Sequence, residues 1–306
     1  MPLVVIPGNH DLNMNNKDRL DSLTAIICDL PQHAAMYHLN ETGVTILGNL
    51  VLSHASIFDY YIIPPAELQS RLDPSRLGKD IGPLTNIALY HGRVNGCELF
   101  NGSRIDGEVN TITKKTITPT NFDGYDMALL GDIHKWQYID NSKSRAYAGS
   151  LIQQNLGEDL DGHGILVWDV AQRTCQHVPI KNDFGYVTFR LANGVCTESL
   201  EDLNLKYPAN LRARILYENT TQTQLDEFIA EVKNRFTLIE YSCQNDEAVI
   251  RSSHATKDSE QQQQKPANEV NINDVGYLNL LIEELIRVSL TNVSDAYIEA
   301  IKFINF

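Results

Sequence analysis

Several features that would point to a particular class of protein are scarce or absent in this sequence. No run approaches the roughly 18 apolar residues of a membrane-spanning helix, so we expect no membrane partner. The five cysteines are odd in number and show no CxxC spacing, which argues against a disulfide framework or a zinc finger and fits a reducing compartment. Basic residues are few, with 25 Lys and Arg against 39 Asp and Glu and a net charge of −14. Bulk charge therefore does not favour nucleic acid, which leaves a local basic patch or bound metal ions as ways to attract it.

The rest of the composition is that of an ordinary folded protein. The chain has 306 residues, of which 42 % are hydrophobic and 21 % charged, and its length suits one large domain and a smaller one. The first residues, MPLVVIPGNHD, lack the charged and apolar regions of a secretion signal. We therefore expect an intracellular protein, in the cytoplasm or with the nucleoid or nucleus.

Apolar spacing in the first half predicts strands that alternate with helices. The expected strands are 2–6, a hairpin over 43–54, 86–90, 127–130 and a second hairpin over 164–170 and 175–180, and the expected helices are 18–30 and 64–72. We expect these elements to form a mixed sheet with helices on its faces, which is an α/β (α+β layered) fold.

The pattern changes after the predicted first domain, residues 1–182. Strands over 186–191, 211–217 and 238–242 and a helix over 224–236 predict a small β–α–β domain within residues 183–251. Residues 252–272 are expected to be a polar linker, because they offer nothing to bury. In the helical tail over 273–306, an amphipathic helix from Asp274 either docks on a partner or folds back on its own core.

The tetrapeptide Gly8-Asn9-His10-Asp11, directly after the first strand, carries the strongest chemical signal. A side-chain amide oxygen at the end of a strand is a good ligand for a hard metal ion. A neighbouring imidazole can protonate a leaving oxygen, and the following carboxylate can orient that imidazole. A plain polar turn is the alternative, since Gly, Asn and Asp are common turn residues.

Two further strand ends carry side chains that bind metals. His91 follows the strand over 86–90, and Asp132 and His134 follow the strand over 127–130. Taken singly, His91 would more readily be a structural histidine. Together with Asn9, these side chains can converge at the carboxyl edge of a sheet. Mixed nitrogen and oxygen ligands that include an amide suit Mn²⁺ or Fe²⁺ better than a thiolate-type zinc site.

These motifs resemble the later motifs of the calcineurin-like metallophosphoesterases: GNHD, a strand-end His, and then a turn of the form Gly-[His/Asp]-x-His. Within that superfamily the sequence is most similar to the SbcD-type double-strand-break repair exonucleases. The segments that carry this closer resemblance are LLGDIHKWQ, AYAGSLIQQNLGE and HGILVWDV. The resemblance spans residues 2–240 and implies a mixed metallophosphoesterase β-sandwich flanked by helices, followed by a capping domain.

The resemblance also implies a site for two Mn²⁺ ions, for which Mg²⁺ or Fe²⁺ could substitute. Four side chains would be the metal ligands: Asn9, His91 and Asp132 for one ion, and His134 for the other. His10 would be the acid or would orient the phosphate, with Asp11 as its support. Two ions held in this way clamp a phosphodiester and activate a water for attack.

The sequence departs from the family pattern in two places. Asp132 stands where most members have a histidine, which is a mild change because a carboxylate oxygen also suits Mn²⁺. The family also opens with a strand ending in Asp-x-His and another ending in Gly-Asp, and neither precedes Gly8 here. Those motifs supply the bridging carboxylate and most ligands of one ion. We therefore expect residues 1–306 to be part of a longer protein and to be weakly active alone.

Basic residues near these motifs are the candidates for contact with DNA phosphates. They are Lys114, Lys115, Lys135, Lys143 and Arg145, with solvated surface charge as the alternative for each. The resemblance implies an SbcC-type, SMC-like ATPase as partner, and residues 298–306 faintly resemble the opening strand of such an ATPase. A homodimer through helices of the first domain stays open.

The sequence thus predicts a metal-dependent hydrolase: a DNA exonuclease and endonuclease subunit of an SbcCD-like complex for DNA repair and recombination. Its substrates would be double-stranded ends and single strands. A phosphatase or cyclic-nucleotide phosphodiesterase of the same fold is one alternative. A non-catalytic subunit that binds the ATPase is the other.

Overall fold

The computed structural model of the protein describes residues 3–12, 21–28, 36–72, 83–110, 112–198, 202–203 and 206–245. The predicted linker over 252–272, the tail over 273–306 and both ends of the predicted helix over 18–30 lie outside these residues. Within the described ranges, no helix is long and apolar enough to cross a membrane.

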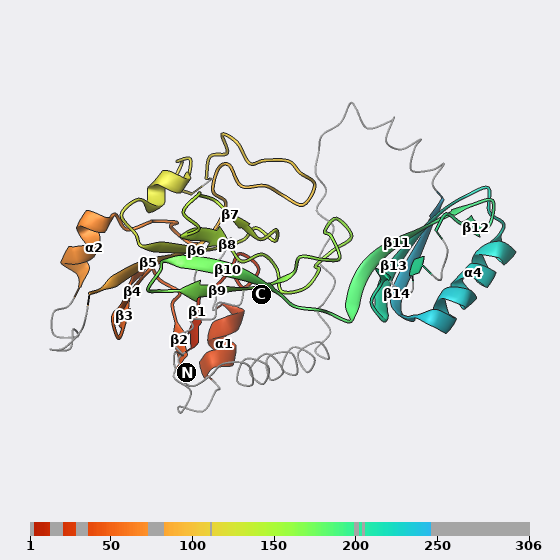
Figure 1. The fold of residues 1–306 in the computed structure, drawn as a ribbon, viewed down its shortest axis with the longest axis horizontal. Helices are drawn as coiled ribbons and strands as arrows, with labels where there is room; N and C mark the ends of the chain where they lie inside the picture. Colours follow the sequence, from red (N-terminus) through yellow and green to blue (C-terminus); the bar gives the residue numbers. More distant parts are fainter. Residues whose placement is uncertain are drawn as a thin grey trace. The chain divides into compact units, whose positions relative to one another are not determined.

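A six-stranded mixed sheet forms the centre of the amino-terminal part of the chain (Figure 1). Its strands lie in the order β3 (Gly43–Leu47), β4 (Leu50–Ala55), β5 (Thr85–His91), β6 (Met127–Gly131), β8 (Arg145–Tyr147) and β7 (Gln137–Tyr138). The four inner strands are parallel, while β3 and β7 pair antiparallel at the edges. Because β5 and β6 run the same way, the residues that follow them meet at one edge of the sheet.

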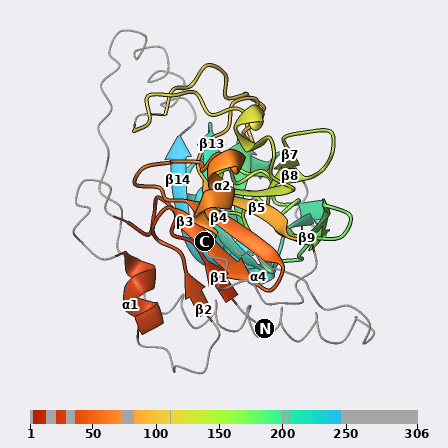
Figure 2. The same cartoon turned by 90° about the vertical axis from the view of Figure 1, so that its left-hand side faces the viewer.

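Both faces of this sheet are buried, and alternate residues of the inner strands divide between two hydrophobic clusters. On one face lies α2 (Pro65–Arg71) (Figures 1 and 2). Its Leu68 and Phe122 of the 3₁₀ helix η2 (Pro119–Phe122) belong to the hydrophobic cluster on that face. The strand residues on that face are Val51, Ala88, Tyr90, Ala128 and Leu130. Those on the other face are Leu52, Ile87, Leu89, Met127 and Leu129. Near-continuous apolar strands such as β5 and β6 are therefore explained by burial on both sides.

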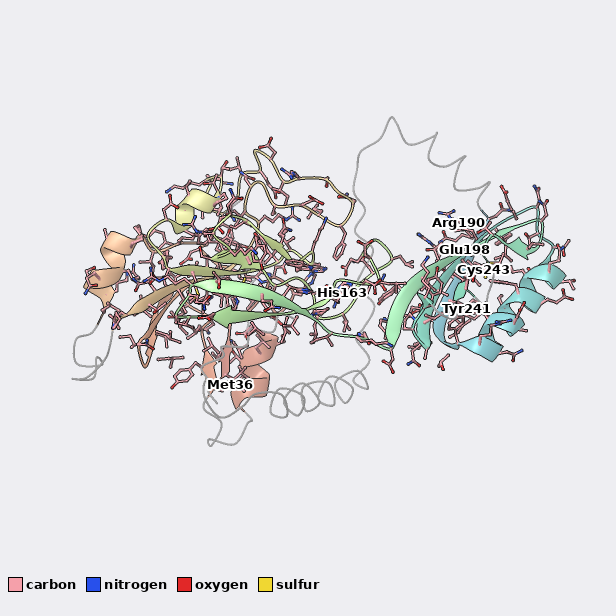
Figure 3. The ribbon with its side chains drawn as sticks, viewed as in Figure 1. Met36, His163, Arg190, Glu198, Tyr241 and Cys243 are labelled. Atoms are coloured by element: carbon pink, nitrogen blue, oxygen red, sulfur yellow. The ribbon has the colours of Figure 1, made fainter. Side chains whose placement is uncertain are left out.

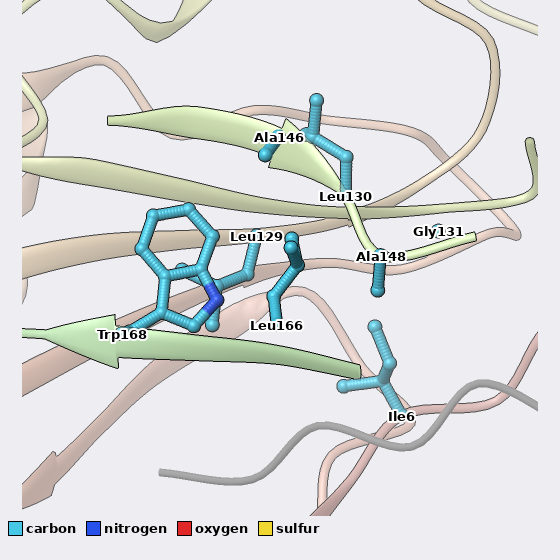
Figure 4. Close-up of a pocket in the computed structure, with 8 residues that line it drawn as sticks. All are labelled: Ile6, Leu129, Leu130, Gly131, Ala146, Ala148, Leu166 and Trp168. Carbon is cyan, nitrogen blue, oxygen red and sulfur yellow. The ribbon is translucent and has the colours of Figure 1, made fainter. Parts of the chain in front are cut away.

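The hairpin of β9 (Gly164–Asp169) and β10 (Thr174–Pro179) covers the second face of the sheet (Figure 1). Leu166 and Trp168 of β9 pack against Leu129 and Ala146. A small apolar gap remains in this layer, where Leu166 and Ile6 approach Ala148 (Figure 4). The side chains that border this gap thus attach the hairpin to the sheet, together with a hydrogen bond from the Tyr138 hydroxyl to the Cys175 carbonyl.

The first strand belongs to a separate small sheet. β1 (Leu3–Val5) pairs in parallel with β2 (Met36–His38), and α1 (Ser22–Cys28) lies beside this pair (Figure 1). Asp21 caps α1 by accepting a hydrogen bond from the Thr24 amide at 2.6 Å. The side chain of Asp21 also lies 3.5 Å from Nε2 of His38, which ties the start of the helix to β2.

Residues 184–245 form a second sheet with its own hydrophobic cluster. Its strands lie in the order β12 (Val195–Cys196), β11 (Phe184–Ala192), β13 (Asn210–Glu218) and β14 (Thr237–Asn245). α4 (Gln222–Arg235) lies along one face of this sheet (Figure 1) and buries Leu225, Phe228, Ile229 and Val232 there. Thr221 and Gln224 form a capping box at the start of this helix.

The element types expected from apolar spacing are confirmed wherever the structure describes them, and the general α/β class is confirmed with them. Both hairpins, α2, α4 and the strands ending at His91 and Gly131 lie within a few residues of their predicted positions. β2, β7, β8 and β12 were not predicted. Each of the four is only two or three residues long, too short for an apolar period to be recognised.

Candidate functional site

The turn after β1 is held closed by Asp11. Its carboxylate accepts a hydrogen bond from the Gly8 amide at 2.7 Å and another from the Ser22 hydroxyl at 3.3 Å. The amide of Ser22 also donates to the Asp11 carbonyl at 2.9 Å. Asp11 therefore supports the turn and joins it to α1, instead of the predicted support of the His10 ring. His10 itself is exposed and lines the cleft next to Asn9.

Gly8 is required because the ring of His91 lies directly against it. A Cβ atom at this position would stand 2.8 Å from Cε1 of His91, closer than side chains tolerate. The absence of that atom lets the turn after β1 approach the end of β5. The glycine of the GNHD motif thus permits a close contact between two segments in which Asn9 and His91 are 82 residues apart.

Asn9, His91 and Asp132 converge, as the sequence predicts, from the ends of β1, β5 and β6. Nε2 of His91 lies 3.3 Å from Oδ1 of Asn9 and 3.7 Å from Oδ1 of Asp132. The Asn9 amide nitrogen Nδ2 lies 3.4 Å from the same carboxylate oxygen. The Asn9 amide oxygen and the Asp132 carboxylate oxygen therefore both lie near Nε2 of His91, and the Asn9 amide nitrogen faces the carboxylate.

The 3.3 Å spacing between Asn9 and His91 suits the coordination shell of a divalent ion, and the 3.7 Å spacing between His91 and Asp132 is slightly wider than in such a shell. In an octahedral shell, neighbouring ligand atoms stand about 3.0–3.5 Å apart when the bonds to the ion are about 2.1–2.5 Å. Among the described residues no group of three or more His, Cys, Asp or Glu could hold an ion, so a site here would include the Asn9 amide. The donor set of one nitrogen and two oxygens fits Mn²⁺, Mg²⁺ or Fe²⁺ better than a thiophilic ion.

The environment of His91 keeps its ring neutral. Its side chain is buried, and this burial lowers the pKa of His91 despite the opposing charges of Asp132 and Asp11. A neutral imidazole has a lone pair to offer to a metal ion, whereas a protonated one has none. His91 is therefore ready to act as a ligand without first losing a proton at neutral pH.

Asp132 is held in an unusual backbone conformation. Its φ is +93°, a region that non-glycine residues rarely adopt and that costs about 1–3 kcal/mol. The side chain is 16 % exposed and lies between His91 and the guanidinium of Arg93, whose Nε stands 3.7 Å from Oδ2. Backbone strain at the end of β6 thus accompanies the placement of this carboxylate beside Asn9 and His91.

His134 lies at the same cleft and is oriented by a carboxylate that the sequence analysis did not assign to the site. Nδ1 of His134 donates to Oε1 of Glu158 at 2.7 Å, and this hydrogen bond raises the pKa of His134. Glu158 is buried and also accepts from the Gln154 amide at 2.9 Å and the Asn155 side chain at 2.9 Å. The arrangement leaves Nε2 of His134 as the nitrogen available to a ligand. The only signal for Glu158 in the sequence was an acidic residue after the Ala-Gly-Ser turn.

That turn forms the back of the cleft. Gly149 has a φ of +75°, and a Cβ atom there would stand 2.8 Å from the His134 carbonyl oxygen and the Trp136 amide. The amide of the next residue, Ser150, donates to the same carbonyl at 2.9 Å. Behind it, the Ser150 hydroxyl lies 3.0 Å from Nδ1 of the buried His163, which precedes β9 (Figure 3). These contacts fix the backbone that carries His134.

Two depressions flank the carboxylate of Asp132. One has an empty volume of ≈ 720 Å³ and is lined by His10, His91, His134 and Ser150. The other has an empty volume of ≈ 630 Å³ and lies on the Arg93 side. Both include Asn9 and Asp132 in their walls, so the convergent side chains separate two open clefts.

The five basic residues proposed to contact DNA differ in their surroundings. Lys114 and Lys115 are exposed. Lys135 pairs with Glu98, and the Lys143 ammonium lies 5.5 Å from the centre of the Tyr138 ring. Arg145 is 16 % exposed, lies 3.0 Å from Asp123 and donates to the Pro119 carbonyl at 2.8 Å. The two lysines of the 114–115 pair are therefore the best placed to meet a ligand.

Comparison with known proteins places the chain beside a viral protein of unassigned activity. No family model matches the sequence. Over 244 residues the chain is 33 % identical to "Uncharacterized protein R555" of Acanthamoeba polyphaga mimivirus. The match covers 78 % of this chain but 16 % of that relative, so the chain spans about a sixth of the relative's length.

Proposed function

We propose that the protein is a metal-dependent phosphodiesterase of the calcineurin-like metallophosphoesterase type, similar to SbcD, and that DNA is its substrate. The observation that carries the proposal is the convergence of Asn9, His91 and Asp132. These residues come from three separate strand ends, where Nε2 of His91 lies 3.3 Å from the Asn9 amide oxygen and 3.7 Å from an Asp132 carboxylate oxygen. The resemblance in the GNHD and GDIH motifs supplies the reaction type.

Each side chain has a distinct role in this proposal. Asn9, His91 and Asp132 hold one divalent ion, and Nε2 of His134 is a ligand for a second. Such an ion, when bound, polarises a phosphoryl oxygen and makes water a stronger nucleophile. His10, exposed beside Asn9, gives a proton to the leaving oxygen, while Glu158 keeps His134 in the required tautomer.

The second ion would have fewer ligands than the first. Apart from His91, the described residues that line the cleft include two imidazoles, His10 and His134. The Glu158 carboxylate beside His134 already accepts four hydrogen bonds. We therefore propose that the chain over 1–306 binds one ion well and is a feeble nuclease alone. An SbcC-type ATPase remains the proposed partner, and the greater length of the viral relative leaves room for further domains in such proteins.

Calorimetric titration of the full chain with Mn²⁺ tests the proposal. We expect one tight site, and Asp132→Asn should weaken it at least about a hundredfold, because loss of even an outer partner of a metal ligand costs roughly 10–100-fold. Asp161→Asn removes the same charge from an exposed surface position and serves as the matched control. Equal Mn²⁺ affinity in the two variants would contradict the proposed site.

Substrate profiling with Mn²⁺ distinguishes the candidate functions. Slow cleavage of linear duplex and single-stranded DNA, lost in Asp132→Asn, supports the nuclease. Hydrolysis of p-nitrophenyl phosphate without any cleavage of DNA supports a phosphatase of the same fold. Tight association with an SbcC-type ATPase without Mn²⁺ binding supports a non-catalytic subunit. The small number of ligands available for a second ion favours this candidate.

A further inference from the structure

The cleft on the Arg93 side of Asp132 has no role in the metal site described above. Besides Asn9 and Asp132 it is lined by Tyr60, Arg93, Asn95, Glu108 and Asn110, and we call this depression the Arg93 cleft. Its empty volume is ≈ 630 Å³, which includes the open solvent at its mouth. A ligand in it would lie directly beside the carboxylate that the proposed ion binds.

Arg93 gives this cleft a positive group suited to a phosphate. Of the described residues that line the two depressions, Arg93 is the only lysine or arginine. Nη1 lies 2.9 and 3.2 Å from the oxygens of Glu108, and Nε lies 3.7 Å from Asp132. The side chain is 55 % exposed, and a guanidinium has five N–H donors. Arg93 can therefore bind an anion while it keeps part of its contact with Glu108.

Amide and aromatic groups provide the rest of the lining. Asn95 and Asn110 are half-buried, and Oδ1 of Asn110 accepts from the amides of Ile112 and Thr113 at 2.9 Å, which leaves its NH₂ group outside that turn. Tyr60 is half-buried, with its ring centre 6.0 Å from that of Tyr90 in an edge-on contact. Side-chain amides read the edges of nucleobases, and aromatic rings stack on their faces.

The predicted pair Lys114-Lys115 belongs to the loop that forms one wall of this cleft. Glu108, Asn110 and Ile117 of the loop line the depression, and the amide of Lys114 donates to the Asn110 carbonyl at 2.9 Å. Both lysines are exposed. Two exposed lysines therefore belong to the same loop that lines the Arg93 cleft.

We propose that the Arg93 cleft binds the nucleotide next to the phosphate held at the metal site. Arg93 contacts the phosphate of that nucleotide, Asn95, Asn110 and Tyr60 receive its base, and Lys114 and Lys115 contact the backbone beyond it. This inference rests on the proposed function, since it names the part of the substrate that lies beside the reacting phosphate. It makes Arg93 a residue that distinguishes a polynucleotide from a small phosphate ester.

Binding of a fluorescein-labelled strand of ten thymidylates to the full chain tests the inference. Fluorescence anisotropy is measured with Ca²⁺ at several salt concentrations. Arg93→Gln should weaken binding about tenfold and reduce the slope of log affinity against log salt by about one, as expected for the loss of one phosphate contact. Arg173→Gln is the matched control, because Arg173 is 60 % exposed and paired with Asp126 at 3.0 Å, away from either cleft. Arg93→Lys should restore the salt slope, and melting curves confirm that each variant is folded.

A strand with abasic positions tests the base contacts. The wild-type protein should bind it more weakly than the thymidylate strand, and Asn95→Ala should remove most of that difference. Equal affinities and salt slopes for Arg93→Gln and Arg173→Gln would overturn the inference, as would equal wild-type affinity for both strands. Failure of the proposed function can be distinguished from failure of this inference. If Mn²⁺ does not bind and no phosphodiester is cleaved, the Arg93-dependent affinity for the strand is still measurable.

Discussion

Nδ1 of His134 lies 2.7 Å from Oε1 of Glu158, and the Glu158 side chain is 4 % exposed. A carboxylate buried this deeply costs free energy unless it is hydrogen-bonded, and Glu158 meets that requirement with His134, Gln154, Asn155 and Ser150. The pair therefore orients an exposed imidazole from the protein interior. It also makes the position of His134 depend on the Ala-Gly-Ser turn and the segment that follows it.

Replacing Glu158 by glutamine tests this dependence. Glu158→Gln keeps the size of the side chain but removes the charge-assisted hydrogen bond, so hydrolysis with Mn²⁺ should fall roughly 10–100-fold. The free energy of unfolding should decrease by about 1–3 kcal/mol, because buried donors lose their ionised acceptor. Asp159→Asn makes the same charge change at the exposed neighbour and should alter neither quantity. Unchanged hydrolysis in Glu158→Gln would mean that His134 needs no orientation.

Asp132→Gly separates strain from ligand function. Glycine adopts a positive φ without penalty, so this variant should unfold with a free energy about 1 kcal/mol higher than the wild type while Mn²⁺ binding is lost. Asn193→Gly relieves a φ of +53° in the turn between β11 and β12, and it should keep its Mn²⁺ affinity. Calorimetric titration and urea unfolding measure both effects. A less stable Asp132→Gly protein would show that the contacts of the carboxylate outweigh its backbone strain.

The stability of the fold should fall in mild acid because of His54. This residue is buried on β4, its Nδ1 lies 3.0 Å from the Glu41 carbonyl oxygen, and burial lowers its pKa to about 4. The unfolded chain binds a proton near pH 6.5, but the folded chain does so only near pH 4. Stability is therefore complete above pH 6.5 and decreases by up to about 3 kcal/mol as the pH falls toward 4.

Urea unfolding at pH 7.0 and 5.0 measures this pH dependence. His54→Leu should unfold with a free energy that changes less between the two pH values than that of the wild type. The comparison concerns the difference between pH values, so any cost of losing the hydrogen bond to Glu41 cancels. An identical pH dependence in both proteins would assign the acid sensitivity to other groups.

The attachment of the β9–β10 hairpin should depend on Leu166, which borders the apolar gap in Figure 4. Leu166→Ala should lower the free energy of unfolding by about 2–5 kcal/mol, because it enlarges an existing void that the surroundings cannot fill. Val167 is the next residue of β9 and is 38 % exposed, so Val167→Ala should cost well under that amount. Equal losses would indicate that the layer around the gap collapses freely.

Local sequence patterns predicted the elements that hold the site better than they predicted the contacts within it. β5 and β6 are recognisable because burial on both faces demands continuous apolar runs, and each run ends at a polar side chain that points to chemistry. Asn9, His91 and Asp132 were found in this way. Their mutual distances depend on the contact of Gly8 with His91, which no local pattern records.

The residues that the sequence analysis missed act across long separations. Glu158 reaches His134 over 24 residues, and Glu108 reaches Arg93 over 15. Glu108 does not differ from a surface glutamate in its local sequence, and the position of Glu158 after the Ala-Gly-Ser turn does not name its partner, so only the tertiary structure identifies the two contacts. For Asp11 the local motif was informative but suggested another contact. Its position in GNHD predicted that it supports His10, whereas its carboxylate accepts a hydrogen bond from Gly8 and closes the turn.

The residues proposed to bind the metal ion follow strands that belong to two different sheets. His91 and Asp132 follow inner strands of the six-stranded sheet, whereas Asn9 follows β1, a three-residue strand that the described residues pair with β2 alone. Short two-stranded pairings open at low free-energy cost. An ion shared by Asn9 and the other two donors would tie this small sheet to the large one. Ion binding and local ordering of the amino-terminal segment would then be a single linked equilibrium, and amide exchange in β1 would report the occupancy of the site.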